Sequence, residues 1–270
     1  MTIQTSLGTP GGNGDIFFDL AGNILTWGSG NSLTVLANRD IVFRTLSDIQ
    51  TTGAGTNITI TAGRNFSSAA GSSIDAQGAG GTLSLTAGGS ITALGGFLNS
   101  NTSGVDATVN VLAQTGNITI GDPGMAVPVV YGCVHGPVTV EATRGNVDLF
   151  GGSGVSDDVA VIGFYDSNLA NFDPTTGPIT VSAGRDMTLQ AGVGAFAHAM
   201  ICKQGRNPHD ITNNPITVNV RGNLFIQSGN AVNAPGAGIG RPQQLTGATP
   251  IHNGDITVNV GGDCTVFWWR

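Results

Sequence analysis

The stretch ITVSAGRDMTL, residues 179–189, decides the fold of this chain. Ile179, Val181 and Ala183 alternate with Thr and Ser, which is the period-two pattern of a strand with one buried face. The residues GRD then turn the chain, and Met187 and Leu189 resume the buried face. The stretch therefore predicts two short strands joined at a tight corner.

Seven further copies of this fragment occur in the chain. The eight copies begin at residues 33, 58, 83, 109, 138, 179, 216 and 256, with spacings of 25, 25, 26, 29, 41, 37 and 40 residues. Repeats of this kind stack, because no single unit buries its apolar face alone. Two strands, a corner and a third short segment per repeat predict an all-β fold, a parallel β-helix with like residues about 4.8 Å apart. Counting a degenerate first coil at residues 15–27 gives about nine coils.

A β-propeller or a β-sandwich is the main alternative, since both are also built from strands and turns. The repeats carry two clear strands rather than the four of a propeller blade, and paired Asn-Gly turns are scarce. We therefore expect a single β-helix domain over residues 1–270, with a short-repeat half at 1–137 and a long-repeat half with protruding loops at 138–270. The abrupt end after a repeat strand favours a fragment of a larger protein.

Two polar columns accompany the apolar ones. Thr, Ser or Asn fills the outward position between the first two apolar residues of each copy, where stacked hydroxyls can form a ladder on a solvated face. Asn or Asp follows the first strand in most copies, and we expect these residues to adopt left-handed backbone and to hydrogen-bond their own turn. They are Asp40, Asn65, Asn117, Asn146, Asp186, Asn223 and Asp263.

Composition narrows the range of functions. The net charge is −7 with only 10 Lys and Arg residues, which argues against a nucleic-acid binder because such proteins need a basic stripe. No stretch reaches about 18 consecutive apolar residues, so no membrane-spanning segment is predicted. Only 10% of residues are charged, and Thr, Ser, Asn and Gly supply the outer polarity, as on many bacterial surface fibres. The first residues lack the charged and apolar regions of a signal peptide.

Three stretches carry a resemblance to a known family: SGNSLTVLANRDIVF (29–43), GTNITITAGRNF (55–66) and GPITVSAGRDMTLQAG (177–192). They are similar to repeats of the filamentous haemagglutinin-like adhesins of Gram-negative bacteria, which are exported by two-partner secretion or similar routes. The endings VAVIGF (159–164) and AGIGRP (237–242) also resemble that family's longer repeats. The resemblance covers about residues 13–267 and implies a right-handed β-helix, secretion or attachment to the outer membrane, and adhesion to a host receptor or glycan. The family's amino-terminal secretion domain is not recognisable in the chain.

The repeat lengthens from about 25 to about 40 residues after Val138. The extra residues are expected at one phase of the repeat, in segments 164–177, 203–214 and 241–254, and such insertions project from one side of a stacked array. Loops on a rigid scaffold commonly carry recognition, so we expect this face to bind a ligand; the alternative is that the loops merely cover one side of the rod. The candidate ligand-binding residues are Tyr165, Asp166, Phe172, Lys203, Arg206, His209, Arg241, Gln243 and His252.

An arginine column also follows the first strand, at Arg39, Arg64, Arg144, Arg185 and Arg221. It could bind anionic glycans, but the simpler interpretation is that solvent or the neighbouring Asp40 and Asp186 hold these side chains apart. The adjacent acidic pair Asp157 and Asp158 would point in opposite directions in a strand, so the clustered carboxylates of a polysaccharide-degrading enzyme are not recognised. No catalytic residue, metal site, calcium site or cofactor is predicted.

Three cysteines, Cys133, Cys202 and Cys264, are expected to be free thiols, because a repeat separates the first two by more than a disulfide can span. Cys264 falls in the inward column of Met187 and Leu224, so we expect it to be a buried small hydrophobe.

The C-terminal residues Phe267, Trp268 and Trp269 form the strongest apolar patch outside the expected core. We expect them to cap the last coil or to mediate end-to-end self-association, since an open sheet edge invites pairing. Together these features predict a non-catalytic bacterial surface adhesin or fibre segment. The alternative is a structural scaffold of an extracellular fibre, and a polysaccharide-degrading β-helix enzyme is a distant third.

Overall fold

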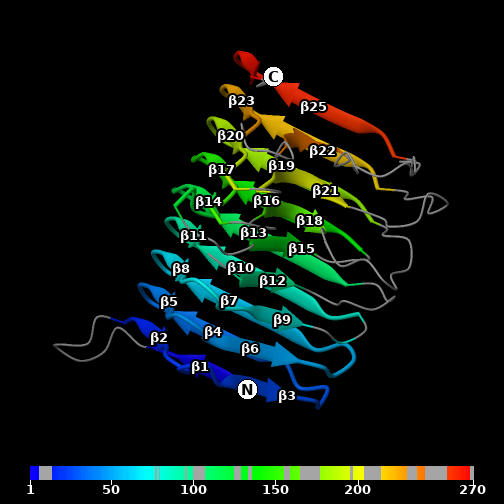
Figure 1. Ribbon diagram of the computed structural model, residues 1–270. Coiled ribbons are helices and arrows are strands. Elements are labelled where there is room, and N and C mark those ends of the chain that lie inside the picture. The colour runs from blue at the N-terminus through cyan, green and yellow to red at the C-terminus, as the bar shows by residue number, and fades with distance from the viewer. Residues whose placement is uncertain are drawn as a thin grey trace.

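A computed structural model shows that the chain forms a parallel β-helix, in which three parallel sheets run along the molecule (Figure 1). The structure describes residues 1–5, 14–76, 78, 80–94, 96–99, 107–124, 129–132, 136–154, 159–164, 177–194, 197–203, 214–229, 236–240 and 254–267. Within these ranges the secondary structure consists of strands, without a helix. The predicted all-β class is therefore confirmed.

Each coil contributes one strand to each of three sheets, which we number in the order the chain visits them. Sheet 1 contains β1 (Thr2–Gln4), β4 (Leu33–Ala37), β7 (Asn57–Ala62), β10 (Thr82–Ala87), β13 (Thr108–Ala113), β16 (Val138–Ala142), β19 (Ile179–Ala183), β22 (Ile216–Val220) and β25 (Ile256–Val260). Sheet 2 contains β2 (Ile16–Phe18), β5 (Ile41–Phe43), β8 (Phe66–Ser68), β11 (Ile91–Ala93), β14 (Ile118–Ile120), β17 (Val147–Phe150), β20 (Met187–Gln190), β23 (Leu224–Gln227) and β26 (Cys264–Phe267).

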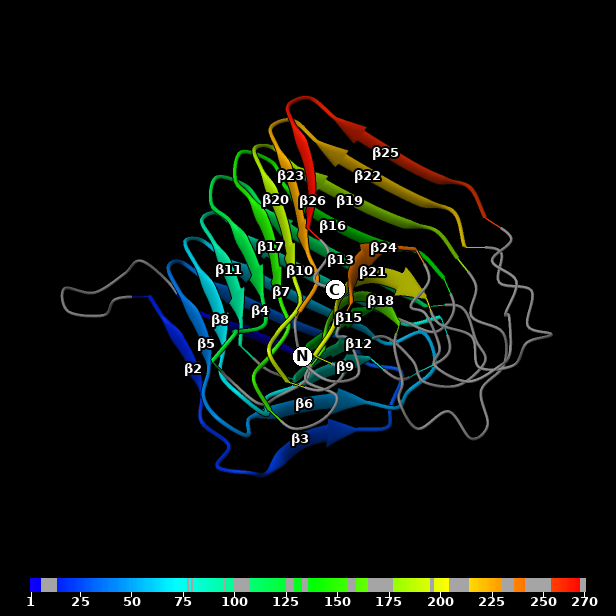
Figure 2. The same ribbon diagram turned by 45° about the horizontal axis from the view of Figure 1, so that its top comes forward.

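Among the described strands, sheet 3 contains one strand fewer than each of the other two sheets. It contains β3 (Ile24–Trp27), β6 (Asp48–Thr51), β9 (Ile74–Ala76), β12 (Gly96–Asn99), β15 (Val129–Gly132), β18 (Ala160–Phe164), β21 (Ala199–Lys203) and β24 (Ala237–Ile239). Nine coils are thus present, as predicted. Figure 2 turns the C-terminal end towards the viewer, and there each coil runs anticlockwise through sheets 1, 2 and 3 as the chain comes forward, so the β-helix is right-handed.

The core consists of columns of like residues, because each strand pairs in register with its equivalent one coil away. Ile60 pairs with Leu85, which pairs with Val111 through β10 and β13, and all three side chains are buried. In sheet 2 the rings of Phe18 and Phe43 stack with centroids 4.4 Å apart. Stacking therefore buries the apolar face that a single coil would leave exposed.

The first coil begins earlier than the sequence pattern indicates. The predicted degenerate coil at residues 15–27 contains β2 and β3, but its sheet 1 strand is β1, in which Ile3 pairs with Val35. Residues 5–15 separate β1 from β2. This spacing does not match the other corners, so the repeat pattern alone could not identify β1.

Candidate functional site

Most of the predicted ligand-binding residues lie outside the described part of the chain. For Lys203 the structure gives the backbone, as the last residue of β21. The remaining candidates, Tyr165, Asp166, Phe172, Arg206, His209, Arg241, Gln243 and His252, fall in the undescribed ranges. What the structure does define is where the three segments that carry them are attached.

The three segments are attached at one corner of the scaffold, between sheets 3 and 1. They leave from the adjacent strands β18, β21 and β24, in which Phe164 pairs with Lys203 and Ile201 pairs with Ile239. They return to the adjacent strands β19, β22 and β25, which begin in register at Ile179, Ile216 and Ile256. The predicted common phase of these insertions is therefore confirmed at their attachment points.

The return points pack closely against one another. Gly177 has a positive φ of 103°, and a Cβ atom there would collide with the carbonyl oxygen of Gly136 on the coil below. Glycine is therefore required at Gly177 by both conformation and space. The segment from β18 to β19 thus enters sheet 1 at a fixed position.

The prediction that all extra residues fall at this corner is wrong. The corner between sheets 2 and 3 also lengthens, from residues 44–47 between β5 and β6 to 151–159 between β17 and β18 and 191–198 between β20 and β21. Here a Cβ atom on Gly192 would collide with the carbonyl oxygen of Gly152. The repeat spacing records only total length, so it could not show that two corners share the added residues.

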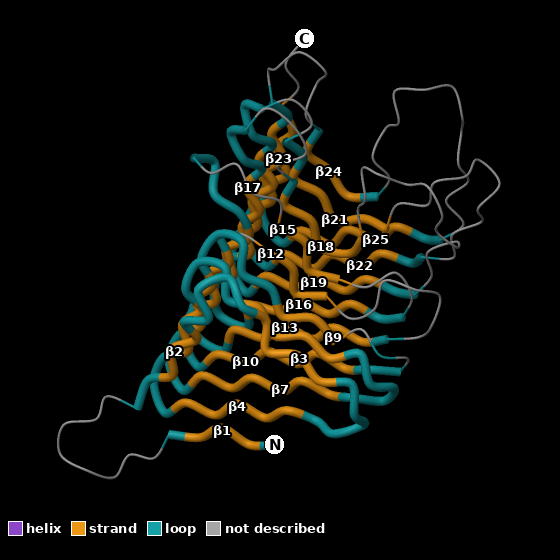
Figure 3. The backbone as a smooth tube through the Cα atoms, turned by 60° about the horizontal axis from the view of Figure 1, so that its bottom comes forward, coloured by secondary structure: helices purple, strands orange, loops and turns teal. Residues whose placement is uncertain are grey.

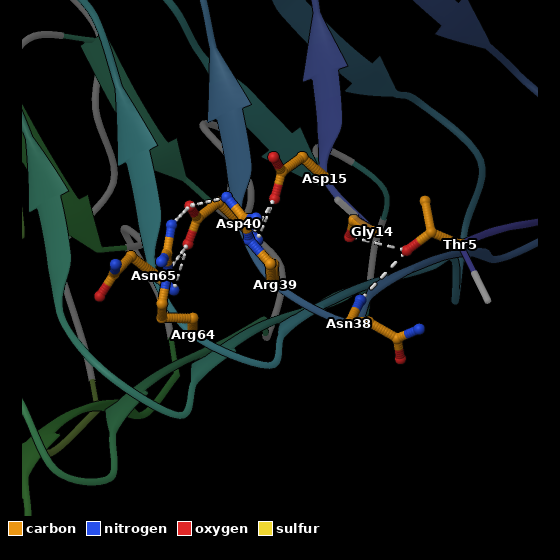
Figure 4. Close-up of polar contacts among 8 residues, drawn as sticks. All are labelled: Thr5, Gly14, Asp15, Asn38, Arg39, Asp40, Arg64 and Asn65. Atoms are coloured by element: carbon orange, nitrogen blue, oxygen red, sulfur yellow. Dashed lines mark hydrogen bonds and ion pairs between the residues drawn. The ribbon is translucent and has the colours of Figure 1, made fainter. Parts of the chain in front are cut away.

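A continuous side-chain ladder runs along the corner between sheets 1 and 2, and Figure 4 shows its beginning at Asp15, Asp40 and Asn65. On each coil, a side-chain oxygen accepts a hydrogen bond from the backbone N–H of the equivalent residue on the next coil. The eight bonds measure 2.7–3.3 Å and run from Asp15 through Asp40, Asn65, Ser90, Asn117, Asn146, Asp186 and Asn223 to Asp263.

This ladder corrects the expected role of the Asn and Asp column. Among the described residues other than glycine, only Ala21 and Leu46 have positive φ, so the column does not adopt left-handed backbone. The side chains satisfy backbone donors one coil away instead of their own turn. The polar column therefore stabilises the stack between coils rather than each corner separately.

Two arginines of the predicted column are paired with carboxylates on the coil below (Figure 4). Nε of Arg39 lies 3.2 Å from Oδ1 of Asp15, and Nε of Arg64 donates a hydrogen bond of 2.8 Å to Oδ1 of Asp40. The hydrogen bond from Arg64 lowers the pKa of the Asp40 carboxyl, against the opposing effect of burial. The interpretation that Asp40 holds a neighbouring arginine is confirmed for Arg64, whereas Arg39 lies nearest to Asp15 and 4.0 Å from Asp40. Among the described residues no ion pair involves Asp186, which was the other expected partner.

The other three arginines of the column are exposed, and no ion pair involves them within the described ranges. Arg185 directly precedes the ladder residue of its own coil, Asp186, as Arg39 and Arg64 precede theirs. On the coil below, however, the ladder residue is Asn146, which carries no charge. Arg144 and Arg221 stand one position further from their ladder residues, with a glycine between. The identity and offset of the ladder residue thus account for which arginines are paired.

Asp148 is the described carboxyl with a raised pKa. It is half-buried on the outer face of sheet 2, and burial is the main cause of the raised pKa. The negative charge of Asp186 also raises the pKa, whereas the hydrogen bond with the Thr188 hydroxyl lowers it. Asp186 accepts a ladder hydrogen bond at Oδ1.

The described residues contain no group of three His, Cys, Asp or Glu side chains that could hold a metal ion. The pair Asp157 and Asp158 lies outside the described ranges.

The two described cysteines are free thiols, as predicted, but Cys264 is exposed rather than buried as expected. Cys202 is buried on the outward side of sheet 3 with Val159, Val161 and Met200, and burial raises its pKa to about 12. Cys264 does occupy the inward column, opposite Leu224, yet it is exposed. It belongs to β26, the edge strand of sheet 2, and no described strand covers it. The register predicted the direction of its side chain but not its exposure.

Comparisons with known proteins find no matching family model, no matching curated protein and no matching solved structure. The resemblance to filamentous haemagglutinin-like repeats therefore stays a prediction from the sequence. In the described part of the chain no helix is long and apolar enough to cross a membrane.

Proposed function

We propose that this protein is a non-catalytic segment of a bacterial surface adhesin or fibre, secreted or attached to the outer membrane, that binds a host receptor or glycan. The observation that carries the proposal is the common attachment of three long segments at one corner of a rigid nine-coil scaffold. Recognition loops are commonly presented in this way, because the scaffold fixes the positions at which the loops are attached while the loop sequences vary. The uncharged outer columns of Thr, Ser and Asn, and the resemblance of the repeats, support the surface location.

The test is binding of the purified protein to a glycan array and to host cells. Alanine substitution at Tyr165, Phe172, Arg206, His209 and Arg241 should reduce binding to a ligand so identified. Matched controls are Leu46→Ala and Val193→Ala, two exposed positions at the corner between sheets 2 and 3, which should leave binding unchanged. Binding that survives replacement of two of the three segments by short glycine-serine linkers would overturn the proposal.

A structural scaffold of an extracellular fibre is the second candidate. It is favoured by the exposed apolar residues of the last coil, which include Ile256 and Val258. If the protein is a scaffold, its chains should assemble with one another but bind none of the arrayed glycans. If it is an adhesin, a single chain should bind an arrayed ligand without assembly. Ligand binding and assembly, measured separately on the same preparation, distinguish the two.

A further inference from the structure

Among the described residues, the strands at both ends of the β-helix lack the features that normally prevent edge pairing. The first coil ends in β1 and β2, with sequences TIQ and IFF, and the last in β25 and β26, with sequences ITVNV and CTVF. None of the four strands contains a charged residue or a proline. Natural proteins usually protect an exposed edge with charge, proline or a bulge, because its free N–H and C=O groups can pair with another chain.

The C-terminal end, where β25 and β26 are the outermost strands (Figure 2), also exposes residues whose equivalents in earlier coils are buried. Ile256 and Val258 are 45% and 40% exposed, whereas their partners one coil below, Ile216 and Val218, are 1% and 0% exposed. Val266, in the inward column of sheet 2, is likewise 45% exposed. Phe267 lies against the ring of Phe225 on the outer side of sheet 2, with centroids 5.4 Å apart, so the inward columns and not Phe267 form the end surface. Trp268 and Trp269 lie outside the described residues.

At the N-terminal end, β1 is the outermost strand of sheet 1 and lies beside β4 (Figure 3), and it continues the same columns. Thr2, Ile3 and Gln4 stand in register with the sheet 1 columns that end at Thr257, Val258 and Asn259. In sheet 2, Ile16 and Phe18 begin the inward columns that end at Cys264 and Val266. The first coil of one chain thus has the residue pattern of the coil that would follow the last.

The corner ladder is complementary at its two ends as well. Asp263 accepts no ladder hydrogen bond from a described residue, and its carboxylate is exposed. The backbone N–H of Asp15 donates no hydrogen bond within the described part of the chain. An acceptor at one end therefore matches a donor at the other, at the same position of the repeat.

We propose that two copies of this chain join head to tail, with β1 and β2 of one copy pairing in parallel with β25 and β26 of another. The predicted register places Ile3 opposite Val258 and Ile16 opposite Cys264, and it joins the Asp15 N–H to the Asp263 carboxylate. Sheet 3 ends at β24, so sheets 1 and 2 carry the contact. The two surfaces differ, so the contact is heterologous and does not close, and it propagates into a filament.

The first test measures mass by multi-angle light scattering over a range of concentrations. The native chain should pass beyond the mass of two copies as concentration rises. Val258→Lys, which places a charge in the end surface, should remain a single chain, whereas Thr139→Lys, on the outer face of a middle strand of sheet 1, should assemble like the native chain. A constant single-chain mass for the native protein, or growth that stops at two copies, would overturn the proposal.

The second test uses the two different ends. Val258→Lys blocks the C-terminal end only, and Ile3→Lys blocks the N-terminal end only, so each variant alone should stay a single chain. A mixture of the two retains one intact end of each kind and should form a complex of two chains that grows no further. Assembly of Ile3→Lys by itself, or no complex in the mixture when circular dichroism shows both variants folded, would contradict head-to-tail pairing. These tests involve no ligand, so their outcome is independent of the proposed adhesion.

Discussion

The Oδ1 atom of Asn65 accepts a hydrogen bond of 2.9 Å from the backbone N–H of Ser90, which lies 25 residues further along the chain. The two residues hold the same position on adjacent coils, and Asn65 itself donates its N–H to Asp40. A buried or half-buried N–H without an acceptor is costly, so this relationship, repeated on every coil, contributes to the stacking of the β-helix.

Replacing Asn65 by alanine should therefore destabilise the protein. The loss of the acceptor for the Ser90 N–H should lower the free energy of unfolding by about 1–2 kcal/mol. Urea unfolding followed by circular dichroism measures the change. The matched control is Asn65→Ser, because Ser90 already fills this position in the ladder and its hydroxyl accepts from the Asn117 N–H. Equal losses for alanine and serine would contradict a role for the side-chain acceptor.

The ion pair between Arg64 and Asp40 predicts an acid-dependent contribution to stability. The pKa of Asp40 is lowered in the folded chain from an ordinary value of 3.8, mainly by the hydrogen bond from Arg64. The contribution is fully present above the unfolded pKa and is lost as pH falls through the folded pKa. Because Arg64 is exposed, solvent screens the pair and we expect the contribution to be small.

Asp40→Asn tests this contribution while keeping an oxygen for the ladder. The stability of the variant should fall less than that of the native chain below about pH 4. Asp263→Asn, at the open end of the ladder and without an ion pair to a described residue, serves as the control. Urea midpoints that change with pH identically in Asp40→Asn and in the native chain would exclude the ion pair as the cause.

Asp148→Asn should affect stability in the opposite direction, because the pKa of Asp148 is raised rather than lowered in the folded chain. Burial raises the pKa of Asp148 above 3.8 in the folded chain, so the unfolded chain ionises first as pH rises and stability falls between the two pKa values. Asparagine avoids this loss and can still accept a hydrogen bond from Thr188. We expect a gain of up to about 1 kcal/mol at neutral pH, since the side chain is partly solvated. The gain should vanish below the unfolded pKa; its persistence there would point to a packing effect instead.

The cysteines should differ sharply in reactivity. Cys264 is exposed and should react with iodoacetamide in the native protein at low concentration, whereas Cys202 is buried with a pKa of about 12 and should not. Peptide mapping by mass spectrometry reports each site separately. Unfolding in urea is the positive control, because it should make Cys202 reactive. Rapid native labelling of Cys202 would show that its cluster on sheet 3 opens readily.

The fold could be predicted from sequence because its determinants are local and repeated. Residues such as Ile179, Val181 and Ala183 define a strand face, and eight copies of that face require stacking. The register follows, since a slip by one residue would turn Thr180 inward and expose Ile179. β1 and the second lengthened corner were missed, because neither repeats at the spacing of the other copies.

The candidate site was less accessible to such reasoning. The repeat pattern predicts that the segments leave the scaffold after β18, β21 and β24. It does not predict how side chains such as Tyr165 and His209 are arranged, because these residues lie outside the repeated fragment. The role of Asn65 was assigned to its own turn, because a single sequence does not show that an acceptor and a donor 25 residues apart are neighbours.

The sequence by itself determined the β-helix, the inward columns and the number of coils, because alternation and repetition act over a few residues at a time. Only the tertiary structure decided which polar groups meet and which apolar residues stay uncovered. Asp15 and Asp263 begin and end one ladder, and Val258 is exposed while Val218 is buried, although their sequence contexts are nearly the same. Exposure and pairing depend on what lies one coil away, and within the described residues no strand pairs with the outer edges of β1 and β25.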